Sequence, residues 1–156
     1  LFLAYLAGTA ASPIAGSLAS RFGRLPTLLV SSGLMAAGAA LTLVPAILVI
    51  LAGLLIFTAG FFGAHTVASS WAPAEADPDA RAQASSLYYL AYYGGSSLFG
   101  WALGFVFASM GWDGVAFAVV ALVAVAVALA LVWLRRPATA AGPEIRPEIR
   151  PDGTSG

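Results

Sequence analysis

Charged side chains are missing from three long stretches of this sequence. No Asp, Glu, Lys or Arg lies in the fifty residues between Arg24 and Glu75, and two further uncharged stretches cover residues 82–112 and 114–134. A charged side chain at the centre of a lipid bilayer costs roughly 2.5 to 3.5 kcal/mol on insertion-based scales, so proteins that cross a bilayer repeatedly keep their charges in the loops. The pattern therefore predicts a membrane protein whose charges mark its loops.

Composition excludes several other classes of protein. Hydrophobic residues make up 60% of the chain and charged residues 9%, whereas an ordinary soluble domain carries about 25% charged residues. With no cysteine and one histidine, the chain has neither a disulfide framework nor a thiolate or histidine zinc site. It also has no lysine, and hence no phosphate-binding loop for ATP. We therefore expect no cofactor, no metal, no nucleic-acid partner and no enzymatic activity.

The two ends of the chain differ in character. The sequence begins at Leu1 within an apolar stretch, without an initiator methionine, a basic leader or a small-residue cleavage pattern. It finishes in a polar segment that contains several prolines and glycines. We interpret the sequence as the carboxy-terminal part of a longer protein whose amino-terminal half is missing.

Helix length sets the number of membrane crossings. A hydrocarbon core about 30 Å thick takes roughly 20 helical residues, so the uncharged stretch before Glu75 has to cross twice. Pro45 is the natural break, because proline lacks a backbone donor and disfavours helix in the residue before it. The sequence thus predicts an all-α, polytopic bundle with five crossings, at residues 1–20, 26–44, 46–71, 83–108 and 114–134.

The arginines orient these crossings. In a five-crossing bundle alternate connections share a side, so all the arginines of residues 1–136 fall on one side: Arg21, Arg24, Arg81, Arg135 and Arg136. The opposite side carries only Asp113. Because Arg and Lys are enriched in cytoplasmic loops, the arginine side is predicted to be cytoplasmic. Residues 137–156, with a tandem Pro-Glu-Ile-Arg at 143–150, are predicted to be a disordered cytoplasmic tail.

Two predicted helices carry polar side chains along one face. Thr58, His65 and Ser69 share a face of the third helix, at spacings of seven and four residues. The fourth helix begins with Gln83 and carries a stripe at i, i+4, i+7 and i+11, formed by Ser85, Tyr89, Tyr92 and Ser96. We expect these residues to line an aqueous cavity that binds a small-molecule substrate. The fifth helix is almost wholly Ala, Val and Leu, and we expect most of its surface to face lipid.

Glycines indicate where helices can approach one another closely. Gly100 and Gly104 form a GxxxG pair, and further glycines lie in the third and fourth helices: Gly60, Gly63, Gly94 and Gly95. Ordinary contact between helices accounts for them, and bending during a transport cycle is the alternative.

Residues 16–24, Gly-Ser-Leu-Ala-Ser-Arg-Phe-Gly-Arg, join the first two predicted helices. This segment resembles the signature loop of the major facilitator superfamily, Gly-x-Leu-x-Asp-Arg-x-Gly-Arg, with Ser20 in the place of the usual Asp. The matching positions are Gly16, Leu18, Arg21, Gly23 and Arg24. Residues 60–71 and 83–100 resemble the corresponding helices of YnfM-type permeases, a group of drug or arabinose efflux-like transporters.

The resemblance covers the chain up to about residue 136. It implies that the five helices correspond to helices eight to twelve of a twelve-helix secondary transporter of the inner membrane, working by alternating access with a small-molecule substrate and protons. In the family, the helix matching residues 46–71 lines the central cavity, and those matching 26–44 and 114–134 lie at the periphery. The residues alone leave open an alternative, a membrane-embedded structural or sensory module whose tail binds a partner.

Two groups of residues fit roles in such a transporter. The guanidinium groups of Arg21 and Arg24 can pair with carboxylates or helix-end carbonyls, which suits a cytoplasmic gate. Carboxylates on the same side are those of Glu75, Asp77 and Asp79. The alternative is that all these charges are solvated loop residues. His65 can change its charge near neutral pH, which suits proton coupling or substrate binding, but a histidine bonded between two helices has the same sequence pattern.

Overall fold

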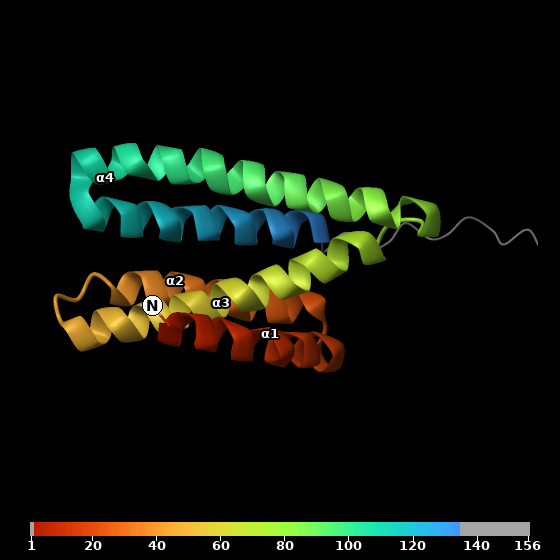
Figure 1. The fold of residues 1–156 in the computed structure, drawn as a ribbon, viewed down its shortest axis with the longest axis horizontal. Helices are drawn as coiled ribbons and strands as arrows, with labels where there is room; N and C mark the ends of the chain where they lie inside the picture. The colour runs from red at the N-terminus through yellow and green to blue at the C-terminus, as the bar shows by residue number, and fades with distance from the viewer. Residues whose placement is uncertain (1, 135–156) are drawn as a thin grey trace, which may run out of the picture.

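The computed structural model describes residues 2–134, which form an all-helical bundle (Figure 1). The helices, in chain order, are α1 (Phe2–Phe22), α2 (Arg24–Leu41), α3 (Ile47–Ala74), the short 3-10 helix η1 (Pro78–Ala80) and α4 (Arg81–Leu134). The predicted all-α class is thus confirmed for the described residues. Arg135, Arg136 and the tail predicted at 137–156 lie outside them.

α4 consists of two helical arms that meet at Gly111. This residue has φ 67° and ψ −158°, in the middle of an otherwise helical stretch. Glycine adopts a positive φ without the steric cost that a Cβ atom brings. The chain reverses there, and the two arms, 81–110 and 112–134, run back alongside each other (Figure 1). The connection predicted around residues 111–113 is therefore present, but it is a single-residue kink rather than a loop.

The boundaries on either side of Pro45 differ from the prediction by a few residues. α2 ends at Leu41, three residues before the predicted end. Residues 42–44 instead form tight turns, in which each N–H donates to the carbonyl three residues earlier, because the residue before a proline is disfavoured in a helix. The end of α3 that lies away from Pro45 also differs from the prediction. α3 extends to Ala74, three residues further than predicted, since the uncharged sequence continues to that point.

The connections lie at two ends of the bundle (Figure 1). The α1–α2 junction at Gly23 and the α3–α4 connection containing η1 lie at one end, where α4 also finishes. The α2–α3 loop and the Gly111 kink lie at the opposite end. Described charged residues at the first end, which we call the arginine end, are Arg21, Arg24, Glu75, Asp77, Asp79 and Arg81.

Three of the described helical stretches are long and apolar enough to cross a membrane: Arg24–Leu41, Ile47–Ala74 and Pro78–Val132. The last of these includes both arms of α4. The predicted count of five crossings stays a prediction.

α3 is the central helix, packed against α1, α2 and α4. Its closest neighbour is α2, because glycines remove the side chains that would separate the two backbones. A Cβ atom added to Gly38 would lie 2.5 Å from the Phe57 backbone nitrogen and 2.6 Å from the Gly53 carbonyl oxygen. A Cβ atom on Gly60 would lie 2.6 Å from the Ser31 carbonyl oxygen.

The predicted close approach is therefore confirmed at Gly60, and Gly63 likewise lies against the Ser31 side chain. For the other glycines singled out from the sequence no close approach is found among the described residues, and for them it stays a prediction. An added Cβ would meet no described atom within 4 Å at Gly94, Gly95, Gly100 or Gly104. These positions all lie on the first arm of α4.

The close contact of Gly38 with the α3 backbone leads to a prediction about stability. We expect Gly38→Leu to lower the free energy of unfolding by about 1–3 kcal/mol, the usual cost of overpacking, because the new side chain would meet the α3 backbone. Gly33→Leu is the matched control, since a Cβ at Gly33 of the same helix meets nothing within 4 Å. Unfolding in detergent micelles, followed by circular dichroism, measures both variants. Equal stability of the two would contradict the close packing of α2 on α3.

Candidate functional site

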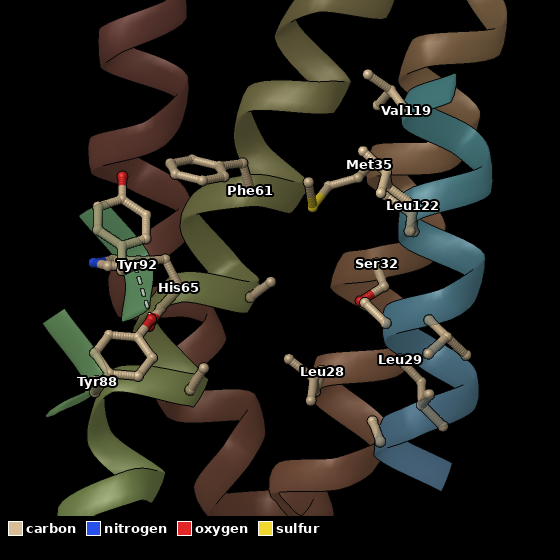
Figure 2. A pocket seen from close by; sticks show the side chains of 16 residues that line it. Leu28, Leu29, Ser32, Met35, Phe61, His65, Tyr88, Tyr92, Val119 and Leu122 are labelled. Carbon is tan, nitrogen blue, oxygen red and sulfur yellow. Dashed lines mark hydrogen bonds between the residues drawn. The ribbon is translucent and has the colours of Figure 1, made fainter. Parts of the chain in front are cut away.

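α3 and the first arm of α4 meet at His65 and Tyr88 (Figure 2). The Tyr88 hydroxyl lies 3.0 Å from Nδ1 of His65 and 3.5 Å from the carbonyl oxygen of the same residue. Both side chains are partly buried. When the hydroxyl donates to Nδ1, a neutral imidazole carries its proton on Nε2. The contact therefore orients the ring and leaves Nε2 as the nitrogen that can serve another partner.

Aromatic rings surround this imidazole. The Tyr92 ring centroid lies 4.8 Å from that of His65, and the Phe61 ring stacks on it at 6.0 Å with an interplanar angle of 14°. The Tyr89 ring lies 6.4 Å away. Phe61 precedes His65 by four residues, and Tyr88 precedes Tyr92 by four, so each pair occupies one face of its helix. We call Phe61, His65, Tyr88, Tyr89 and Tyr92 the aromatic cluster.

Four members of the aromatic cluster, Phe61, His65, Tyr88 and Tyr92, form one wall of a cavity of about 390 Å³ between α2, α3 and both arms of α4 (Figure 2). This volume lies within the range of about 300–1,000 Å³ typical of small-molecule sites. The opposite wall comes from α2 and the second arm of α4, where Figure 2 labels Leu28, Leu29, Ser32, Met35, Val119 and Leu122. The cavity thus has one aromatic wall with polar atoms and one mainly aliphatic wall.

The second arm of α4 differs in part from the expectation that it faces lipid along most of its surface. Its residues Val119, Leu122 and Val123 line the cavity, because this arm packs against α2. Its other side is exposed, with Phe117 and Leu129 at 63% and 55% of their full accessible area.

The structure brings together only some of the side chains predicted to line a cavity. His65 and Tyr92 line it, and Tyr89 belongs to the aromatic cluster. Two other hydroxyls bond to carbonyls of their own helix: Thr58 to Leu54 at 2.7 Å and Ser69 to Thr66 at 3.3 Å. Residues of the predicted set that do not line this cavity are Thr58, Ser69, Gln83, Ser85, Tyr89 and Ser96.

Tyr88 and Phe61 are the cluster members that the sequence patterns did not select. The polar stripe predicted on the fourth helix starts at Ser85, and this spacing includes Tyr89 but leaves out Tyr88. A stripe built instead from the pair Tyr88 and Tyr92 would have found the partner of His65. Phe61 could have been found in the same way, since it lies one helical turn before His65 and so shares its face of the helix.

The signature loop lies at the arginine end. Gly23 separates α1 from α2 with φ 97°, a conformation that favours glycine. Gly16 lies on an exposed part of α1, and Arg21 in its last turn is exposed as well. Together with Ser20 and Arg24, Gly16 borders a second cavity, of about 240 Å³.

Arg24 connects the start of α2 to the end of α3. Its Nη1 lies 3.3 Å from Oε1 of Glu75, and the same oxygen accepts a hydrogen bond from Nε1 of Trp71 at 2.8 Å. The Arg24 guanidinium carbon lies 6.0 Å from the centroid of the Trp71 ring. The predicted pairing of a loop arginine with a nearby carboxylate is therefore found at Arg24 and Glu75. The pair is partly exposed, and pairs of this kind contribute about 0.2–1 kcal/mol.

Comparison with known proteins decides the family. The sequence model of the Major Facilitator Superfamily matches residues 1–151. The chain belongs to this superfamily. The curated relatives that the chain matches are named as transport proteins.

The chain is similar to bacterial transporters. It is 47% identical over 115 residues to the inner membrane transport protein YnfM of Escherichia coli (strain K12), a match that covers 74% of the chain and 27% of YnfM. It is 38% identical over 115 residues to the uncharacterized MFS-type transporter YybF of Bacillus subtilis (strain 168), covering 74% of the chain and 28% of YybF.

An uncharacterized transporter of Buchnera aphidicola subsp. Schizaphis graminum is 38% identical over 131 residues, covering 84% of the chain and 32% of that protein. The chain thus spans about a third, or less, of the length of these curated relatives. No solved structure matches the chain significantly.

The bond between His65 and Tyr88 predicts an energetic coupling across the two helices. In a double-mutant cycle of His65→Leu and Tyr88→Phe, we expect a coupling of about 0.6 kcal/mol, the average for hydrogen bonds between membrane helices. Tyr93→Phe replaces Tyr88→Phe in the control cycle, because the Tyr93 ring is exposed and contacts other tyrosines. Thermal unfolding in detergent gives the four stabilities of each cycle. Additive effects of His65→Leu and Tyr88→Phe would contradict the hydrogen bond.

Proposed function

We propose that this chain is the carboxy-terminal part of an inner-membrane secondary transporter, which moves a small solute by alternating access and is coupled to protons. The amino-terminal half of the same protein would supply the rest of the transport pathway. Membership of the superfamily supports a small-molecule substrate and a bilayer environment, and similarity to an inner membrane transport protein supports that location. These comparisons favour transport over a structural or sensory module.

The distribution of charge supports five crossings with the arginine end in the cytoplasm. Connections at the arginine end carry Arg21, Arg24 and Arg81, whereas Asp113 is the charged residue of the described chain at the other end. This asymmetry agrees with the enrichment of arginine in cytoplasmic loops. One helix before the signature loop and four helical stretches after it support their assignment as helices eight to twelve of a twelve-helix fold.

The observation that carries the proposal is His65 in the cavity wall, hydrogen-bonded across two helices. Ionisable groups within membrane segments are costly and commonly belong to substrate or proton pathways. Of the described Arg, His, Asp and Glu residues, His65 is the one that lies far from any helix end. Its bond to Tyr88 joins α3 to α4, so a change in the charge or ligand of the imidazole alters a contact between helices.

The direct test is transport by the full-length protein in proteoliposomes, with and without a pH gradient. We expect solute-dependent proton movement, reported by a pH-sensitive dye as candidate solutes are added. His65→Gln is expected to lose the stimulation by the pH gradient, because an amide can bond to Tyr88 but cannot take up a proton. His65→Ala is expected to weaken substrate binding as well. A His65→Ala protein that kept both the substrate affinity and the pH dependence of the wild type would discard the role of His65.

The ion pair at the arginine end predicts a kinetic effect. We expect Arg24→Ala to slow the initial rate of transport about two- to fivefold, since it removes a partly exposed ion pair worth up to about 1 kcal/mol. Arg21→Ala is expected to slow it as well. Arg24→Lys is the matched control, because it keeps the charge without the planar fork that suits carboxylates. The amount of each variant in the membrane is measured in parallel and is expected to be unchanged. Wild-type transport rates in both Arg21→Ala and Arg24→Ala would contradict a role of these arginines in a cytoplasmic gate.

A further inference from the structure

The Tyr88 hydroxyl has two possible partners on a single residue of the neighbouring helix. Its oxygen lies 3.0 Å from Nδ1 of His65 and 3.5 Å from the backbone carbonyl oxygen of His65 (Figure 2). A hydroxyl carries one hydrogen, which rotates about the C–O bond, and its oxygen can accept a hydrogen bond at the same time. The hydroxyl therefore donates to one of these two atoms, and the other remains as an alternative.

The His65 carbonyl is able to accept this bond. Within an α-helix a carbonyl oxygen accepts a hydrogen bond from the N–H four residues later, and its second lone pair remains available. Tyr88 lies on the first arm of α4, so its hydroxyl approaches this lone pair from outside α3. The Tyr88 hydrogen thus has an acceptor even when Nδ1 cannot accept it.

Neighbouring rings restrict the movement of the imidazole. The Phe61 ring stacks on it at 6.0 Å, and the Tyr92 ring centroid lies 4.8 Å from its own. Turning the imidazole would displace these packed rings, whereas a hydroxyl hydrogen rotates without moving a heavier atom. We expect a change in the charge of the imidazole to be met by rotation of the Tyr88 hydrogen.

The charge of the imidazole decides which way the hydrogen bond runs. In a neutral ring with its hydrogen on Nε2, Nδ1 is an acceptor and the Tyr88 hydroxyl donates to it. In a charged ring both nitrogens carry a hydrogen, so Nδ1 becomes a donor and the Tyr88 oxygen accepts. The hydroxyl hydrogen then has to point elsewhere, and the His65 carbonyl oxygen is the acceptor within reach.

The titratable groups whose rings contact His65 are Tyr88, Tyr89 and Tyr92, all on the first arm of α4. The other elements packed against α3 are α1, α2 and the second arm of α4. Their charged side chains within the described residues lie at helix ends or beside the Gly111 kink: Arg21, Arg24 and Asp113. Tyr88 is thus the titratable neighbour that hydrogen-bonds to the imidazole.

We propose that Tyr88 is a positioning residue that holds His65 in both of its charge states. Its hydroxyl donates to Nδ1 of the neutral ring. When the ring is charged, the Tyr88 oxygen accepts from Nδ1 and the hydroxyl donates to the His65 carbonyl. The contact between α3 and α4 is kept, and the direction of its hydrogen bond reverses. This inference rests on the proposed proton coupling and deepens it, since it states how the contact between the helices responds to a proton.

Solid-state NMR of the full-length protein in lipid bilayers tests this inference, with ¹⁵N in the histidine rings and ¹³C at the ζ carbons of tyrosine. The His65 signals are those that His65→Gln removes. Because a bare imidazole nitrogen and one that carries a hydrogen resonate in separate regions, the spectrum gives the tautomer. We expect a bare Nδ1 at high pH, two nitrogens with hydrogens at low pH, and magnetisation transfer between Nδ1 and a tyrosine ζ carbon in both states.

The wild-type spectra alone can overturn the inference. A neutral ring that carries its hydrogen on Nδ1 would contradict the expected direction of the bond. Loss of the transfer between Nδ1 and the tyrosine when the ring becomes charged would show that the contact breaks instead of reversing. Neither measurement depends on a variant that has to fold.

Tyr88→Phe removes the hydroxyl and keeps the ring. We expect both neutral tautomers of His65 at high pH, because the bond that favours a hydrogen on Nε2 is gone. We also expect the pH profile of transport to shift toward lower pH, because the charged ring loses the stronger, charge-assisted bond. Tyr93→Phe is the matched control, since Tyr93 is exposed and its ring contacts Tyr89 and Tyr92. A wild-type tautomer and pH profile in Tyr88→Phe would overturn the inference.

Transport measurements separate this inference from the proposed function. Wild-type protein that moves a solute without coupled proton flux, yet shows both expected spectra and their change in Tyr88→Phe, would contradict the proposed coupling and support the positioning role. Proton-coupled transport whose pH profile and His65 spectra are the same in Tyr88→Phe as in the wild type would leave the proposed function standing and overturn the positioning role.

Discussion

The exclusion of charge from the interior of the helices is the constraint on which the rest of the structure depends. Each charged residue that the structure describes lies at a helix end, in a connection or next to the Gly111 kink. In a lipid environment a helix satisfies its own backbone hydrogen bonds, so long uncharged stretches fold as helices and charges remain where those helices end. The few polar side chains inside the bundle therefore need partners, either a carbonyl of their own helix or a group on a neighbouring helix. His65 and Tyr88 meet this need for each other.

α3 links the two places where function is proposed. Its close contact with α2 through Gly38, Gly53 and Gly60 fixes the position of the helix in the bundle. From that position it presents His65 to the first arm of α4, while Glu75, just after its last residue, pairs with Arg24 at the arginine end. A tilt of α3 relative to α4 would change the His65 contact, and a tilt relative to α2 would change the ion pair. One central helix thus provides a physical route by which events in the cavity and at the arginine end are connected.

Much of this arrangement could be predicted because it follows from local patterns. The long uncharged stretches predicted the helices, and the chain reverses at Gly111, where a connection was predicted. The loop at residues 16–24 indicated the correct superfamily. What could not be predicted depends on how helices are rotated about their axes. The choice between Tyr88 and Tyr89 as the partner of His65 is such a rotation, and so is the close approach at Gly38. Periodicity also could not tell that the hydroxyls of Thr58 and Ser69 bond to their own helix, since serine and threonine do this readily.

The orientation of the helices in the membrane can be measured directly, because the chain contains no cysteine and single cysteines introduced into it report their own position. The measurement is labelling of Ser20→Cys, Asp79→Cys, Val44→Cys and Asp113→Cys by a membrane-impermeant maleimide, in intact cells and in inside-out vesicles. The account predicts that the first two react only from the cytoplasmic side and the last two only from the opposite side. Labelling of Ser20→Cys and Asp79→Cys from opposite faces of the membrane would contradict it.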